Sequence, residues 1–217
     1  MRSVLRSAIP TLLGVFAVLA GCAPYRQDLT DPNPSAWSRL STGAVPAILP
    51  ADSPVKAVAA RTRTHASSYR SYRAVLSNGT TLPGENRLSI DVEYTPRHFL
   101  EFVDPPPRLF PIPLYTAETL TATLESEFPD LAAEQAHAPR RNRYGLYDYA
   151  VAHRGRDSCV LAWQLLDDHK RMLPDTLRAI RLEWRVCGTN TEPAALLAPF
   201  DQLKLTVDPD ILIKESF

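Results

Sequence analysis

The sequence predicts an α+β fold: one domain with a largely antiparallel sheet and two helices packed on one face. Two observations carry this prediction. Apolar and polar residues alternate strictly over Arg87–Tyr94 and again over residues 180–187, which is the pattern of half-buried strands. Segments of this kind outnumber the helical ones, and those near the cysteines are joined by short connections, as antiparallel neighbours allow.

Further strands are expected on either side of these two segments. Residues 72–77, 143–152, 159–166 and 202–207 carry strand-forming side chains, and the segment 159–166 has the character of a more buried strand. A turn is expected over residues 82–86, because proline presets one backbone angle while glycine and asparagine tolerate a positive φ.

Two helices complete the predicted domain. The first covers residues 116–128, because Thr116 can cap it and large apolar residues recur every four positions on one face. Pro129 then ends this helix, since proline cannot continue the hydrogen-bonding pattern. The second helix is expected over about residues 192–201 and leads into the last strand.

The start of the chain has the pattern of an export signal. Arg2 and Arg6 precede an uncharged run over residues 7–20, which is too short to span a membrane comfortably but suits the apolar region of a signal peptide. The run ends in L-A-G-C, similar to the lipobox at which bacterial lipoproteins are lipidated and cleaved before cysteine. We therefore expect Cys22 to become a lipidated first residue; an ordinary cleaved signal is the alternative.

A lipid on Cys22 would tether the protein to a membrane without spanning it. Ala23 follows instead of the aspartate that retains lipoproteins of enteric bacteria in the inner membrane, so the outer membrane, facing the periplasm, is the expected location. The expected organisation is a signal peptide over residues 1–21, a Pro/Ser-rich linker over 22–68 and a folded domain over 69–217.

Charge and cysteine content limit the classes of function. Loss of residues 1–21 lowers the 24 Lys+Arg to 22 against 24 Asp+Glu, a net charge of −2, so the sequence predicts no nucleic-acid partner. Of 3 cysteines, lipidation uses one, and we expect the other two, Cys159 and Cys187, to form a disulfide in an oxidising compartment. Strand parity puts Cys187 on the polar face with Arg185, so the bridge would need a twist or a bulge.

Reactive residue types gather between residues 153 and 159, but their placement argues against catalysis. His153, Asp157, Ser158 and Cys159 surround a segment with the composition of a hairpin turn, where side chains are solvated rather than convergent. Neither a nucleophile elbow nor a metal-binding spacing of His and Cys occurs, and there is no phosphate-binding glycine loop. We expect no catalytic residue, no metal and no cofactor.

Aromatic side chains offer a weaker indication of binding. Tyr144, Tyr147 and Tyr149 could present flat surfaces to sugar rings, although tyrosines in strands more often pack in the core. They are our candidates for contact with a glucan or a partner protein.

Three segments give the chain a family resemblance: LSNGTTLPGENRL at 76–88, NRYGLYDYAV at 142–151 and DSCVLAWQ at 157–164. Together with Cys187, they resemble the cellulose biosynthesis protein BcsN family of exported alphaproteobacterial lipoproteins. The resemblance implies a non-enzymatic accessory role in cellulose biosynthesis or secretion. Components of the cellulose synthase complex, and the cellulose chain itself, are the implied partners. A lipoprotein of another envelope assembly, such as a pilus or a peptidoglycan-associated machine, is the alternative, and an envelope hydrolase is a third.

Overall fold

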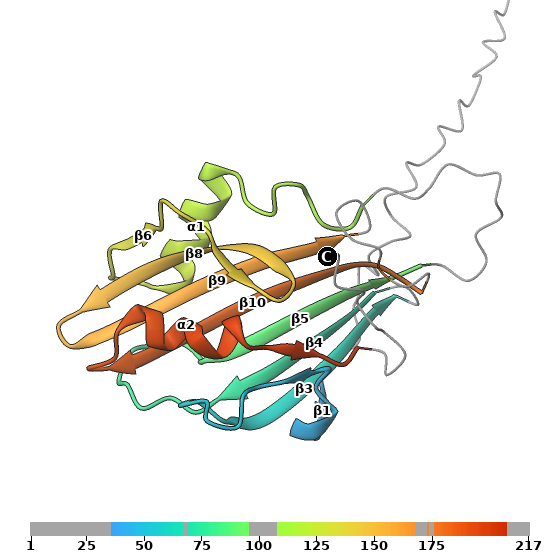
Figure 1. Cartoon of the computed structure of the whole chain (residues 1–217), viewed down its shortest axis with the longest axis horizontal. Coiled ribbons are helices and arrows are strands. Elements are labelled where there is room, and N and C mark those ends of the chain that lie inside the picture. Colours follow the sequence, from blue (N-terminus) through green and yellow to red (C-terminus); the bar gives the residue numbers. More distant parts are fainter. Residues whose placement is uncertain (1–35, 67–68, 96–107, 168–172, 174–175, 208–217) are drawn as a thin grey trace, which may run out of the picture.

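The computed structural model describes residues 36–66, 69–95, 108–167, 173 and 176–207 (Figure 1). Their main feature is a 9-stranded sheet with the order β1-β3-β4-β5-β10-β9-β8-β6, while β7 pairs with β8 off this path. Its strands are β1 Ser38–Leu40, β3 Ala57–Ala66, β4 Tyr69–Leu76, β5 Arg87–Tyr94, β6 Ala133–Gln135, β7 Arg140–Asn142, β8 Gly145–Arg154, β9 Asp157–Asp167 and β10 Leu177–Thr189. A 2-stranded sheet joins β2 Ala47–Ile48 to β11 Lys204–Leu205.

Every strand pairing in this part of the chain is antiparallel, which confirms the predicted fold class. Two α-helices, α1 Ala117–Glu127 and α2 Pro193–Asp201, and a short 3-10 helix, η2 Thr42–Ala44, accompany the sheets. Thr116 caps α1 as expected, because its side chain accepts a hydrogen bond from the Thr119 backbone N–H at 3.2 Å. None of the helices in the described ranges is long and apolar enough to cross a membrane.

The two helices lie on opposite faces of the sheet, so the prediction that both pack on one face is wrong. α2 covers Trp184, whose indole N–H donates to the Leu196 carbonyl at 3.0 Å. α1 packs instead over Leu161, which alternates along β9 with side chains of the α2 face. The physical reason lies in β9, where the run CVLAW is apolar on both faces and therefore needs a cover on each side.

The predicted linker over residues 22–68 extends too far into the folded domain. The strands β1 and β3 lie within it, and β3 pairs with β4 along its length. β3 escaped notice because its sequence, AVAARTRTHA, places arginine and threonine where an apolar period would be expected. Residues 1–21, Cys22 and the rest of the linker up to residue 35 lie outside the described part of the chain.

The predicted disulfide is present between Cys159 and Cys187. The two cysteines are directly opposite each other on β9 and β10, in the same register as the opposed pair Leu161 and Arg185. The bridge therefore needs no bulge, because Arg185 and Leu161 share the face that α1 covers. The predicted bulge assumed that the face with Arg185 is exposed to solvent, but Arg185 is 1% exposed.

Candidate functional site

A groove of about 460 Å³ lies between the segment that leads into α1 and the strands β8 and β9. Tyr115 and the start of α1 form one wall, and Trp163, Leu165 and Asp167 of β9 contribute to the other. This hollow has both aromatic and polar lining, and we take it as the candidate site.

An aromatic pair forms the apolar part of the groove. Tyr115 directly precedes the cap of α1, and Trp163 points to the α1 face of β9; their rings meet edge to face with centroids 5.3 Å apart. The Tyr115 hydroxyl donates to a carboxylate oxygen of Glu183 at 2.7 Å. Burial first, and then the charge of Glu183, raise the pKa of Tyr115, so this phenol stays protonated and is a fixed donor.

Exposed apolar side chains form the rim. Leu146 of β8 is 58% exposed and Ile112 is 50% exposed, so both are open to a ligand above the groove. Large apolar side chains that are this exposed on a folded domain are typical of contact surfaces when they border a hollow. The rim can therefore pack against the apolar face of a ligand.

Polar groups complete the lining. Asp148 is exposed and directly opposite Trp163 in the sheet register. Gln164 is held in place by Asn142, because the two side-chain amides exchange hydrogen bonds at 2.8 and 3.1 Å. At the other end, Asp167 pairs with Arg108 at 3.0 Å. These fixed acceptors and donors suit a neutral ligand that is rich in hydroxyl or amide groups.

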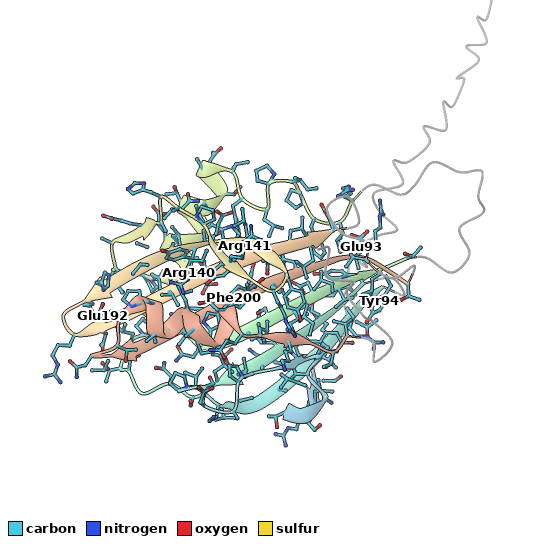
Figure 2. All side chains as sticks on the ribbon, in the orientation of Figure 1. Glu93, Tyr94, Arg140, Arg141, Glu192 and Phe200 are labelled. Carbon is cyan, nitrogen blue, oxygen red and sulfur yellow. A yellow bond between two sulfur atoms is a disulfide. The ribbon has the colours of Figure 1, made fainter. Side chains whose placement is uncertain are left out.

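The three tyrosines of the sequence prediction lie mainly in the core beneath α2. Tyr144 is 5% exposed and Tyr147 is 2% exposed. Tyr147 packs edge to face on Phe200, which projects from α2 in Figure 2, and its hydroxyl donates to Asp201. Tyr147 also lines the groove, whereas Tyr144 uses its hydroxyl to accept the Leu205 backbone N–H at 2.6 Å.

Tyr149 is partly buried and packs at the edge of the same core. Burial and the Asp201 carboxylate raise the pKa of Tyr147, while Arg140 of β7 pairs with Asp201 at 2.6 Å beside α2 (Figure 2). Tyr147 thus joins β8 to α2. The sequence did not single out Tyr115 and Asp148, which line the groove where Tyr144 and Tyr149 were expected. The alternation of side chains along β9 could have indicated that Trp163 and Asp148 share the α1 face of the sheet.

The reactive cluster of the sequence prediction forms a hairpin, as expected. Gly155 occupies the turn with a φ of 61°, between β8 and β9. His153 Nδ1 lies 3.1 Å from the Ser158 hydroxyl on the exposed surface, and Asp157 accepts a hydrogen bond from Thr189. Cys159 is held in the disulfide and offers no free thiol. Within the described ranges, no three His, Cys, Asp or Glu side chains lie close enough to hold a metal ion.

The fold and the groove define an antiparallel α+β protein with a surface suited to binding. A family model described as cellulose biosynthesis protein BcsN matches residues 47–211, and the chain belongs to this family. Membership confirms the resemblance carried by the three sequence segments and makes the chain an accessory protein of cellulose biosynthesis. No curated protein and no solved structure matches the chain.

Proposed function

We propose that this chain is a non-enzymatic accessory protein of cellulose biosynthesis and secretion, anchored by a lipid on Cys22 and located in the cell envelope. The observation that carries the proposal is the family match over residues 47–211, in a chain whose start has the pattern of a lipoprotein signal. Its place is the periplasmic side of the outer membrane, since Ala23 gives no retention signal of the enteric type. Its partners are components of the cellulose synthase complex.

The groove supports a binding role in this process. A glucan chain presents C–H faces that pack on apolar and aromatic side chains, and hydroxyl groups that bond to carboxylates and amides. The groove offers both kinds of surface: Leu146 at the rim and Trp163 in the wall are apolar, and Asp148 is an exposed carboxylate. We therefore propose the emerging glucan, or a secretion component at the same place, as its occupant. Of the three predicted tyrosines, Tyr147 borders the groove, but its ring packs against Phe200 of α2 and is not the contact surface.

Loss of the groove surface is expected to reduce cellulose output. In a strain lacking the gene, wild-type protein should restore cellulose staining of colonies, whereas Leu146→Asp should restore much less of it, because a charge replaces the apolar rim. Val58→Asp is the matched control: Val58 is also an exposed apolar residue on a strand, at 62%, but lies on β3 away from the groove. Normal cellulose amount and architecture in the deletion strain would refute the proposed function.

Lipidation is expected to depend on Cys22 alone. Cells grown with a clickable fatty acid should label the wild-type protein, and Cys22→Ser should abolish the label and release the protein from the membrane fraction. A Cys159→Ala, Cys187→Ala double variant is the control, because it removes both other cysteines and should keep the label. Equal labelling of Cys22→Ser and wild type would rule out the anchor.

A further inference from the structure

A row of polar side chains crosses the α1 face of the sheet at a distance from the groove. Adjacent strands β1, β3, β4 and β5 (Figure 1) place these residues directly opposite one another in turn: Arg39, Arg61, Arg73 and Ser89. Arg87 lies two positions before Ser89 and thus on the same face of β5. Directly opposite residues have Cβ atoms about 4.5–5.5 Å apart, so these side chains form one compact cluster.

This cluster holds all of the buried side-chain nitrogen and oxygen atoms that lack a hydrogen-bond partner within the described structure. They are Nε of Arg61, Arg73 and Arg87, and the hydroxyl of Ser89. Ser89 is 6% exposed, so water has little access to its hydroxyl. Buried polar groups are nearly always paired in native proteins, so four unpaired atoms in one place need an explanation.

The unpaired atoms share one chemical property. An arginine Nε can only donate a hydrogen bond, and a serine hydroxyl can donate one as well as accept. Donors therefore meet donors in this cluster, and the group that would satisfy them is a hydrogen-bond acceptor. A water molecule could accept from one or two of them, but the surrounding charge favours an acceptor with negative charge.

The charges of the cluster are only partly balanced. Arg61 pairs with Glu85 at 2.7 Å, and Arg87 pairs with Glu127. Arg73, by contrast, has no ion pair or hydrogen bond to another described residue, and only the ring of Trp37 lies over it, at 5.1 Å. Burial first, then the positive charges of Arg87 and Arg61, lower the pKa of Arg73, and the carboxylates of Glu85 and Glu183 do not offset them.

Glu183 continues the row on β10 but is occupied elsewhere. Its carboxylate accepts the Tyr115 hydroxyl at 2.7 Å and lies 4.0 Å from Arg181. Arg73, which lies between Arg61 and Ser89 in the row, is thus a guanidinium without an ion pair to a described carboxylate. A planar guanidinium beside a hydroxyl is a favourable arrangement for binding an oxyanion.

We propose that Arg73 and Ser89, flanked by Arg61 and Arg87, form a binding site for one oxyanion group, a carboxylate or a phosphate. Trp37 stacks on the guanidinium groups of Arg61 and Arg73 and keeps them in a fixed orientation. An unmodified glucan is uncharged, so the ligand of this site differs from the occupant proposed for the groove. Binding at this site is independent of binding in the groove.

Thermal unfolding of the purified full chain tests this site. Inorganic phosphate and succinate are titrated separately, each against sodium chloride at matched ionic strength. At least one anion should raise Tm in a saturable manner, by about 3–6 °C at tenfold above its Kd. A response to phosphate alone identifies a phosphate ligand, and a response to succinate alone identifies a carboxylate.

The variants separate binding from folding. Arg73→Gln should remove the response to the anion, Ser89→Ala should weaken it, and Arg154→Gln, an exposed arginine at the β8–β9 turn, should keep it. In chloride buffer, Arg73→Gln should unfold at no lower a temperature than wild type, because folding disfavours the unpaired charge. The proposal is overturned if wild type responds to neither anion beyond ionic strength, if Arg73→Gln responds equally, or if Arg73→Gln unfolds several degrees earlier in chloride.

Discussion

Replacement of Arg185 by methionine is expected to lower the free energy of unfolding by about 3–5 kcal/mol, the cost of breaking a buried ion pair by removing one partner. Arg185 is 1% exposed and donates to the backbone carbonyls of Pro83 at 2.7 Å, Glu85 at 2.9 Å and Glu127 at 3.0 Å. It also pairs with the Glu127 carboxylate at 3.1 Å. Methionine fills similar space but leaves the three backbone carbonyls without this donor, while the Glu127 carboxylate keeps only Arg87.

Arg185 joins two segments that are distant in sequence. One is the turn after β4, and the other is the end of α1, where the last carbonyls of a helix lack partners within the helix. The Arg185 guanidinium satisfies the Glu127 carbonyl there and stacks over Phe128 at 5.2 Å. Burial lowers the pKa of Arg185, and the Glu127 carboxylate opposes this change. The Arg185 guanidinium keeps its charge because these partners stabilise it. Its loss would therefore remove the link between the turn and the end of α1.

Urea denaturation followed by tryptophan fluorescence measures this effect. Arg141→Met is the control, because Arg141 is exposed on β7 and its loss should change the free energy of unfolding by less than about 0.5 kcal/mol. Arg185→Lys keeps the charge but not the planar set of donors, so we expect it to recover little of the loss. A loss below about 1 kcal/mol for Arg185→Met would show that the guanidinium contributes little to folding.

Loss of the disulfide is expected to cost about 3.5 kcal/mol, because the bridge between Cys159 and Cys187 closes a loop with a sequence separation of 28. The Cys159→Ala, Cys187→Ala double variant keeps small apolar side chains at two buried positions and removes the link. Its free energy of unfolding should be the same with and without a reductant.

Wild-type protein provides the comparison for the double variant. Reduced wild type should approach the stability of the double variant, whereas oxidised wild type should stay well above it. If the reductant leaves wild type unchanged while iodoacetamide shows both thiols free, the bridge does not contribute to stability.

Local patterns in the sequence were sufficient for most of the sheet. Strict alternation predicted β5 with its bounds, and the cysteines and the turn at Gly155 predicted how β9 meets β10 and β8. β3 was missed because arginine and threonine interrupt its apolar pattern: Arg61, opposite Arg73 of β4, stands where a strand against a core would carry valine. Its strand character comes from its neighbours.

The glycine of the turn at residues 82–86 is needed because of a contact with a distant part of the chain. Gly84 has a φ of 94°, and a Cβ atom at this position would lie 2.5 Å from an Arg185 guanidinium nitrogen. Glycine is therefore needed both for the backbone angle and for the close approach of a side chain about 100 residues further along the chain. The angle was predictable from P-G-E-N, whereas the approach of Arg185 was not.

The candidate site was less predictable, for a geometric reason. Along β8, Tyr147 and Tyr149 point to the α2 face, whereas Leu146 and Asp148 point to the groove. Alternation shows which side chains of a strand share a face, but it does not show which helix covers that face. The sequence therefore could not decide which of the two pairs of residues lines the groove. Tyr115 reaches the groove only through the packing of α1.

The strand order has a consequence for how the protein faces its surroundings. The described chain enters the sheet at β1, on one edge, whereas the groove lies at β8 and β9, near the other (Figure 1). Six strand-to-strand steps of about 4.8 Å separate β1 from β8, or roughly 30 Å across the sheet. If the domain is held by its N-terminal end, the width of the sheet would separate the point of attachment from the groove. The groove would then lie on the side of the domain away from the surface that holds it.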